Sequence, residues 1–367
     1  MNTLLSAIGL AEKGYEVDLL SGRTMEPDND LIERAGSSGV RFIYEERLVR
    51  DIHPVKDITA FFRVLGFLRR NRYDIVHAHS SKAGLICRMA AKCAGVKNTV
   101  YTPHGHVFYG YFGRELSRMV VFAEALLAHI TDRTIGLTPA ECDEWLRFGI
   151  GKKDMYEAIP SGIEFDRLEL EAEKGKDWRK ELGIPREAPF IGSTGRFAEV
   201  KGYKYFIRAA AEQVKKHPDT HFLLAGDGPL RGEFEKIIKT SGIEKNFHII
   251  DWQENAGSVI KAFDVFVLSS LNEGMGRALI EAMFLCKPVI ATRVGGVPSV
   301  VSKDTGALVE PASSQALAAA MDRLLSDRGK LEEMGRKARE RALAGYSAGE
   351  MVNRLDKLYR ELLENNK

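Results

Sequence analysis

The stretch Asp264–Arg293, "DVFVLSSLNEGMGRALIEAMFLCKPVIATR", contains two apolar runs of strand length separated by a helical pattern. The first run, "VFVL", leads into a glycine-containing loop, and "RALIEAMF" then repeats apolar residues at helical spacing. The second run, "PVIAT", is rich in β-branched residues and follows directly. Two strands joined through a helix pair in parallel within one sheet, so this stretch predicts a parallel α/β fold.

The same alternation extends over nearly the whole chain. The predicted strands lie in "YEVDLL", "VRFIYE", "YDIVHAH", "NTVYTP", "RTIGLT" and "YEAIPSG", and then in "APFIGSTGR", "HFLLAGDG", "FHIIDW", "DVFVLSS", "KPVIATR" and "TGALVEP". A polar segment, residues 164–188, separates the two series. We therefore predict two doubly wound domains, residues 1–164 and 165–345. Residues 346–367 form a predicted amphipathic helix with apolar Met351, Leu355, Leu358 and Leu362 at helical spacing.

Composition limits the possible partners and settings. The 367 residues have a net charge of +2, which gives no electrostatic reason to expect a nucleic-acid partner. No apolar run reaches the roughly 18 residues that a membrane-spanning helix needs. The cysteines form no C-x-x-C pair, which argues against a zinc site or a disulfide framework and favours the cytoplasm; they are Cys87, Cys93, Cys142 and Cys286.

The chain opens with a helix where a doubly wound sheet normally opens with a strand. Residues 2–13, "NTLLSAIGLAEK", have the apolar spacing of a helix, which Gly14 ends. In the common strand order the first strand is central, so its loss would leave unpaired backbone on two neighbours. We therefore expect that the sequence starts inside its first domain, after the first strand and its Gly-rich loop; an unusual fold is the alternative.

Glu273 and Glu281 border the loop and the first turns of the helix predicted in the opening stretch. Glycines let the loop backbone approach a ligand, and N–H groups at a helix N-terminus favour anions. Glu281 lies roughly 9 Å along the helix, which suits a ligand with hydroxyls at both ends and phosphates between them. The pair is explained equally well without a ligand: Glu273 would be an acid that favours the positive N-terminal end of the helix dipole, and Glu281 would be a solvated helix residue. The ligand hypothesis adds Gly274, Met275, Gly276 and Arg277 as binding residues.

A second loop, in "STGRFAEVKGYKYFIRAA", carries two cations between a predicted strand and a predicted helix. Arg196 and Lys201 are bracketed by Gly195 and Gly202, where the backbone must turn. The two cations are placed to clamp a diphosphate and to offset its growing charge as a leaving group. A surface loop with routine basic residues is the alternative.

Histidines follow two predicted strands of the first half. His77 and His79 alternate on one strand, so both rings lie on one face, but no third ligand makes a convincing metal site. His104 follows the strand in "TVYTPHG". Polar residues at strand ends in α/β folds line ligand crevices, although a histidine there also serves a purely structural role.

Together these motifs resemble the retaining nucleotide-sugar glycosyltransferases of family 4. The resemblance runs through "GRFAEVKG", "LLAGDGPLR", the E-x7-E pair, "KPVIATRVGGVPSVV" and "TGALVEP" in order. It implies the GT-B fold: two Rossmann-like domains facing a central crevice, with the C-terminal helix returning to the first domain. It implies a hexosyltransferase-type enzyme (EC 2.4) that moves a sugar from a UDP- or GDP-sugar to a saccharide or lipid-linked acceptor with retention, without a metal or other cofactor.

The resemblance also implies residue roles. Glu273 contacts the donor sugar, Glu281 the ribose, Arg196 and Lys201 the diphosphate, and His104 the reacting centre from the first domain. "FHIIDWQE" would line the base pocket, although Asp251 stands where the family usually has glycine.

"HSSKAGLICRMAAKCAGV" and "TPHGHVF" look like the family branch that assembles exopolysaccharides and lipid-linked glycans at the inner membrane face. This suggests Ser81, Lys82, His106 and Tyr109 as acceptor-side residues. "FFRVLGFLRRNRY" is either a core helix with a basic end, with Phe61, Leu65 and Leu68 on one buried stripe, or a peripheral membrane contact.

Two other functions remain open at this point. A nucleotide-sugar epimerase has the same two-domain plan, and a truncated domain would bind nucleotide without turnover.

Overall fold

The computed structural model describes residues 2–22, 28–49, 53–105 and 113–365. The chain divides into two compact units: Met1–Gly162 together with Ala348–Lys367, and Ile163–Ser347. Each of the twelve predicted strand segments contains a strand, and every strand pair among the described residues is parallel. The prediction of a parallel α/β fold is therefore confirmed.

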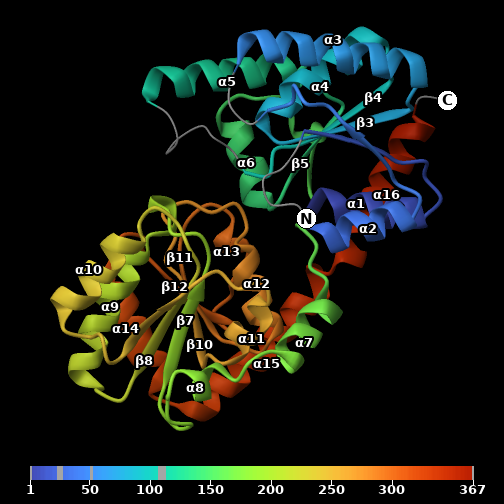
Figure 1. The fold of residues 1–367 in the computed structure, drawn as a ribbon. Helices are drawn as coiled ribbons and strands as arrows, with labels where there is room; N and C mark the ends of the chain where they lie inside the picture. The colour runs from blue at the N-terminus through green and yellow to red at the C-terminus, as the bar shows by residue number, and fades with distance from the viewer. Residues whose placement is uncertain (1, 23–27, 50–52, 106–112, 366–367) are drawn as a thin grey trace. The chain divides into compact units, whose positions relative to one another are not determined.

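The first unit alternates helices and strands from its first residues (Figure 1). Its elements are α1 (Asn2–Glu12), β1 (Asp18–Ser21), α2 (Asn29–Ser37), β2 (Arg41–Tyr44), α3 (Pro54–Asn71), β3 (Ile75–His79), α4 (Ser81–Ala94), β4 (Asn98–Thr102), α5 (Arg114–Ala128), β5 (Arg133–Gly136), α6 (Pro139–Arg147), η1 (Lys153–Met155), β6 (Tyr156–Ala158) and α16 (Ala348–Glu364).

The strands of this unit form two sheets. One has the order β1-β2 and the other has the order β3-β4-β5-β6. Within the described residues, β1 pairs with β2 alone and β3 pairs with β4 alone. The hydroxyl of Tyr73, just before β3, donates to the carboxylate of Asp18 at the start of β1 and so connects the two sheets.

Two helical layers bury the faces of the four-stranded sheet. Alternate residues of a strand point to opposite faces, and β3 follows this rule. Ile75 packs in a cluster with α1, α2 and α16, whereas Val76 packs in a cluster with α3 and α4. The C-terminal helix contributes apolar residues at every turn to the first of these clusters, which also contains Leu5 and Ile8 of α1.

A buried ion pair fixes α5 to α4. Arg88 of α4 is 1% exposed and donates to Glu124 of α5 over 2.7 Å. The guanidinium also lies 3.7 Å from the ring centre of Tyr101 on β4, whose hydroxyl donates to Glu124 over 3.3 Å. Burial raises the pKa of Glu124, and Arg88 opposes this effect. The buried charges of Arg88 and Glu124 therefore compensate each other.

The second unit has a single six-stranded sheet of order β12-β11-β10-β7-β8-β9. Its elements are α7 (Phe165–Lys174), α8 (Trp178–Glu181), β7 (Phe190–Thr194), η2 (Glu199–Lys201), α9 (Tyr203–Lys216), β8 (His221–Ala225), α10 (Arg231–Ser241), β9 (Phe247–Ile250), α11 (Ala256–Lys261), β10 (Val265–Leu268), α12 (Arg277–Phe284), β11 (Val289–Thr292), α13 (Val297–Val300), β12 (Gly306–Val309), α14 (Ser314–Leu325) and α15 (Arg328–Gly345). This is the doubly wound order, and its direction reverses between β7 and β10.

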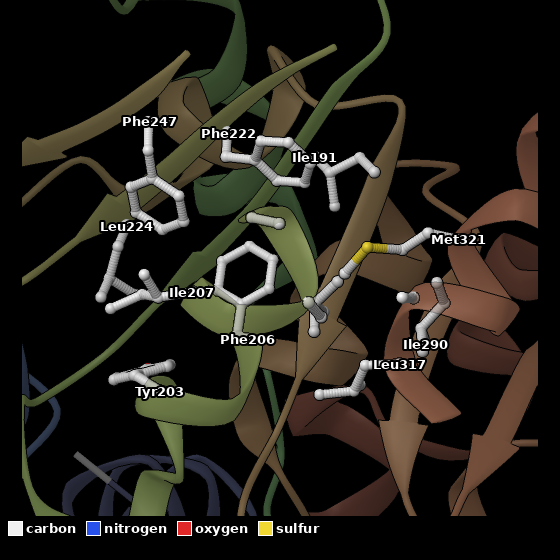
Figure 2. Close-up of a cluster of buried hydrophobic side chains, with 14 of the residues drawn as sticks. Ile191, Tyr203, Phe206, Ile207, Phe222, Leu224, Phe247, Ile290, Leu317 and Met321 are labelled. Atoms are coloured by element: carbon white, nitrogen blue, oxygen red, sulfur yellow. The ribbon is translucent and has the colours of Figure 1, made fainter. Parts of the chain in front are cut away.

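One face of this sheet is closed by α9 and α14. Figure 2 shows Phe206 of α9 among side chains of the sheet; its ring lies 6.0 Å from Phe222 on β8 and 5.6 Å from Phe247 on β9. Leu317 and Met321 of α14 belong to the same cluster. Each fully buried apolar side chain contributes about 1.5–3 kcal/mol, so this core holds the sheet rigid beneath its loops.

The polar segment 164–188, which separates the two predicted series of strands, is part of the second unit. It forms α7 and α8, and Phe165 stacks on Phe284 of α12 with ring centres 4.3 Å apart. Across the part of the chain that the structure describes, no helix combines the length and apolar character needed to cross a membrane.

The buried ion pair gives a stability prediction. Glu124→Ala leaves the Arg88 guanidinium buried without a counter-charge, so we expect a loss of about 3–5 kcal/mol in the free energy of unfolding, measured by urea titration. Glu115→Ala on the same helix is the matched control, because its pair with Arg118 is exposed and is worth about 1 kcal/mol or less. Equal losses in the two variants would contradict the role assigned to the buried pair.

Candidate active site

The loops after β7 and β10 meet at the carboxyl ends of two adjacent strands. In open α/β sheets, ligands bind where the strand order reverses, and β7 and β10 are the neighbours at that point. The Leu271 amide donates to the Val200 carbonyl over 2.7 Å, and the Ser269 hydroxyl donates to the Lys201 carbonyl over 2.9 Å. The two loops predicted from separate motifs therefore form one structural unit.

This arrangement brings Lys201 and Glu273 together. The Lys201 ammonium lies 2.6 Å from Oε2 of Glu273, and the Ser270 hydroxyl donates to the same oxygen over 3.1 Å. The Glu273 side chain is 16% exposed and the Lys201 side chain 26%, so the pair is largely but not fully covered. A carboxylate with one face held and one face open can accept hydrogen bonds from a ligand hydroxyl.

Two glycines permit the close approach of backbone around Glu273. Gly202 has φ +60°, and a Cβ there would lie 2.2 Å from the Ser269 carbonyl oxygen. Gly295 has φ +47°, and a Cβ there would lie 2.1 Å from the Glu273 carbonyl oxygen. The neighbouring Gly296 amide donates to that same carbonyl over 3.1 Å. Any larger residue at either glycine would push the loops apart.

The helix after this loop coincides with the predicted helical run of residues 277–284. Gly276, with φ +81°, is the N-cap of α12, so Gly274 and Met275 belong to the loop and Arg277 is the first helical residue. Met275 is buried at 3% exposure and anchors the loop in the core. Glu281, one turn into α12, accepts from Arg277 over 2.9 Å. The second predicted acid is thus paired with a cation, as the first is.

Arg196 is exposed on the loop after β7. The next residue, Phe197, is fully buried, and its amide donates to the Asp227 carbonyl over 2.7 Å in the loop after β8. The anchored neighbour holds the backbone of Arg196 at the carboxyl end of the sheet.

The strand predicted to line a base pocket is β9. Asp251, directly after it, is 81% exposed in its side chain and lies 2.7 Å from Arg231 of α10. Trp252 is 62% exposed. Asp251 is therefore engaged by a neighbouring helix at the end of the strand.

In the first unit, three histidines form a row at the carboxyl ends of β3 and β4. Nδ1 of His79 lies 2.9 Å from Nε2 of His104, and the His77 and His79 rings stack with centres 4.1 Å apart. His77 also contacts the hydroxyls of Tyr359 on α16, at 2.7 Å, and Thr102, at 2.8 Å. The C-terminal helix thus helps to position this row.

Burial keeps the histidine row neutral near neutral pH. It lowers the pKa of His77 to about 3 and that of His104 to about 4, and it lowers the pKa of His79 well below its ordinary value. A neutral His104 has one nitrogen that donates and one that accepts, which allows it to bind a hydroxyl. Its φ of +59° is unusual for a residue other than glycine, a feature that concentrates at functional sites.

Glu141 of α6 holds the chain next to His104. Its carboxylate is 3% exposed and accepts from the Leu137 amide over 2.6 Å and from the Gly105 amide. Burial raises the pKa of this carboxyl to about 7. Sequence reasoning did not identify Glu141; the run Thr138–Glu141 carries the T-x-x-E signature of a helix start and gives a local signal, but not the contact with Gly105.

The acceptor-side candidates are only partly described. Lys82 is 2.5 Å from Asp57 of α3 and donates to the Val49 carbonyl over 3.0 Å, so it ties α4 to α3. Ser81 interacts with the hydroxyl of Tyr101. His106 and Tyr109 lie outside the described residues.

The sequence nominated Glu273, Lys201, Glu281 and His104 as site residues, but it did not predict the contacts that the structure gives them. It weighed His77 and His79 as a metal pair. In the structure they join a stacked and hydrogen-bonded row, and the described residues contain no cluster of three or more acids, histidines or cysteines suited to a metal. Tyr359, about 280 residues away in sequence, has no local signal.

Two family models match the chain. Residues 5–167 match Glycosyltransferase Family 4, and residues 175–341 match Glycosyl transferases group 1. Among curated proteins, an Escherichia coli UDP-Gal:alpha-D-GlcNAc-diphosphoundecaprenol alpha-1,3-galactosyltransferase is 28% identical, with 89% of this chain and 85% of that protein covered. A D-inositol 3-phosphate glycosyltransferase from Corynebacterium urealyticum is 27% identical, with 96% and 88% covered.

Solved structures share the fold. Anabaena HepE in complex with UDP superposes with a TM-score of 0.80 at 20% identity, covering 98% of this chain and 96% of that one. Sucrose-phosphate synthase from Thermosynechococcus elongatus superposes with a TM-score of 0.81 at 23% identity, covering 98% and 92%.

The histidine row predicts a pH dependence of stability. The folded-state pKa of His77 is depressed from 6.5 to about 3, so its contribution is present above pH 6.5 and is lost as pH falls toward the folded value. At about pH 5 the loss is on the order of 2 kcal/mol for this one histidine. Urea unfolding at neutral pH and at about pH 5 should show a smaller pH effect in His77→Gln than in wild type. His129→Gln, an exposed change in the same unit, should leave the wild-type effect intact; an unchanged slope in His77→Gln would contradict the prediction.

Proposed function

We propose a specific reaction for this chain, which belongs to glycosyltransferase family 4 and has the GT-B fold. Its general activity is the transfer of a sugar from a nucleotide sugar to an acceptor. The donor is a UDP-hexose, the acceptor is a saccharide on a polyprenyl diphosphate, and the anomeric configuration is retained. The observation that carries this proposal is the pairing of Lys201 with Glu273 where the sheet order reverses. A GDP-sugar is the alternative donor.

The donor assignment rests on charge placement in the second unit. Glu273 offers a partly open carboxylate to the sugar hydroxyls, and Glu281 offers another, one turn into α12, to the ribose. Arg196, Lys201 and the N-terminus of α12 supply positive charge for the diphosphate. The Escherichia coli relative is named for UDP-Gal and Anabaena HepE was solved with UDP, which favours uridine over guanosine.

The acceptor assignment rests on the first unit and on one relative. The neutral His104 can hydrogen-bond an acceptor hydroxyl, and Glu141 holds the adjacent Gly105 in place. The Escherichia coli relative is named for a sugar carried on diphosphoundecaprenol, which supports a lipid-linked saccharide here. A cytoplasmic enzyme that contacts the inner membrane face would reach such an acceptor.

The anomeric configuration is retained when the acceptor attacks the anomeric carbon on the same face from which the diphosphate departs. The bond between the anomeric carbon and the phosphate oxygen breaks while the acceptor oxygen bonds to that carbon. The acceptor proton passes to an oxygen of the departing diphosphate. Arg196, Lys201 and the helix N-terminus take over the developing negative charge, so we propose that no metal or other cofactor is needed.

The alternatives are less well supported. The reported relatives are named as transferases, which favours transfer over the epimerase reaction. A nucleotide-binding domain without turnover is tested by comparing donor binding with product formation.

Donor choice predicts a ligand-dependent shift in thermal unfolding. A ligand that binds the folded state stabilises it by mass action, by about 2.7 kcal/mol at one hundred times its dissociation constant. We expect UDP and UDP-sugars to raise the unfolding midpoint, with GDP and ADP giving a smaller shift at equal concentration. A larger shift with GDP would overturn the choice of uridine.

Two acid substitutions separate catalysis from donor binding. Glu273→Gln removes a charged contact to the sugar, and we expect at least about a tenfold lower kcat. Glu281→Ala removes a ribose contact and should mainly raise the KM for the donor, with kcat nearly unchanged. Glu310→Gln is the control, because that acid is 75% exposed in the same unit. Wild-type kinetics in both site variants would defeat the assignment.

A further inference from the structure

Three helices of the first unit expose large apolar side chains. Of the fourteen large hydrophobic residues that are exposed in the described parts of the chain, nine lie on α3, α4 and α5. Such a concentration differs from the scattered exposed apolar residues of an ordinary surface. We call these nine the outer face: Val55, Ile58 and Phe62 of α3, Leu85 and Met89 of α4, and Leu116, Met119, Phe122 and Leu126 of α5.

Helix α5 carries apolar residues on both of its sides: Val120, Val121, Ala125 and Ala128 pack on a buried cluster, and a second apolar row is exposed. Its buried residues are Ser117, Glu124 and Leu127, whereas Met119 and Phe122 are 67% and 66% exposed. In an ordinary surface helix the apolar stripe faces the core and the charged residues face water. The inner side of α5 is fixed by the ion pair of Glu124 with Arg88, so the apolar row cannot turn inward without breaking that pair.

The three helices form one continuous layer. Val64 and Leu68 of α3 pack against Ile86 and Ala90 of α4 in one buried cluster, and Arg88 joins α4 to α5. In Figure 1 the three helices lie together on one side of β3, β4 and β5. The exposed apolar side chains of α3, α4 and α5 point away from the sheet and from the contacts between the helices, so they lie on one side of this layer. Phe61, Leu65 and Leu68 form the inner stripe predicted for α3, while Phe62 belongs to the outer face.

The charges around the outer face are predominantly positive. On α3, α4 and α5, which the structure describes in full, the exposed acid is Glu115, and Arg118 pairs with it over 3.1 Å. The chain as a whole is nearly balanced, with 53 basic and 51 acidic residues, so the basic excess is local. The exposed basic residues of the three helices are Lys56, Arg63, Arg69, Arg70, Lys92, Arg114 and Arg118.

We propose that the outer face docks on a lipid bilayer that contains anionic phospholipids. Apolar side chains on helices lying in the membrane plane enter the boundary between headgroups and acyl chains, and basic side chains attract anionic headgroups. Docking of a second copy on the same face would place the basic residues of both copies against each other, which disfavours a symmetric dimer. The biological role of this docking rests on the proposed lipid-linked acceptor, but the surface itself follows from exposure and charge.

Flotation of the full chain with vesicles tests the docking. We expect binding to vesicles of phosphatidylcholine with phosphatidylglycerol, weaker binding at high salt, and little binding to phosphatidylcholine alone. Met119→Ser/Phe122→Ser should weaken binding by at least about tenfold, since two exposed apolar side chains no longer enter the bilayer. Lys56→Glu/Arg70→Glu should weaken it by at least about tenfold and reduce its salt dependence.

Leu170→Ser/Leu343→Ser is the matched control, because it removes two exposed apolar side chains from the second unit and should leave binding unchanged. Thermal unfolding checks that every variant is folded. The docking proposal is overturned if wild type binds neither vesicle, if the Met119/Phe122 variant binds as tightly as wild type, or if wild type is a dimer that this variant converts to a monomer.

Transfer to a detergent-solubilised lipid-linked acceptor separates the two proposals. Normal transfer by wild type without vesicle binding would refute docking and leave the proposed function intact. Vesicle binding without transfer to that acceptor would support docking and refute the acceptor assignment.

Discussion

The parallel pairing of β7 with β10 is the constraint on which the candidate site depends. The carboxyl ends of these two strands lie at the same edge of the sheet. The loops that follow them, about 70 residues apart in sequence, are therefore brought together. Gly202 and Gly295 allow the loop backbones to touch where a side chain would not fit. Lys201 then reaches Glu273, and a motif that is only a helix start in isolation becomes a charged, partly open binding surface.

A different constraint organises the first unit. Arg88 of α4 and Glu124 of α5 are buried between the two helices, and a buried charge is stable only when an opposite charge compensates it. The pair lies on the inner side of α5, whereas Met119 and Phe122 are exposed. A fully apolar interior would be at least as easy to stabilise, so the arrangement makes sense when the outer surface has a partner of its own.

The sequence predicted the strands and nominated candidate site residues because these signals are local. Short β-branched runs, glycines before helices and the spacing of Glu273 and Glu281 can each be recognised within a few residues. The polar segment 164–188 resembles a linker by composition, and the stacking of Phe165 on Phe284 shows how it packs within the second unit. The helical spacing of residues 277–284 matches α12, and the backbone conformation of Gly276 makes this residue its cap.

The sequence by itself determined the parallel α/β class, the two series of strands, and the chemical types of the residues that follow those strands. Only the tertiary structure decided which of these residues meet. His77 contacts Tyr359 of the last helix, Glu141 holds the Gly105 amide beside His104, and Lys201 pairs with Glu273. It also decided that α5 leaves a row of apolar side chains exposed in addition to those it packs inward. The physical reason is that periodicity and turn chemistry act between near neighbours, whereas ion pairing, burial and neutral histidines depend on groups that only the packing of distant segments brings within a few ångströms.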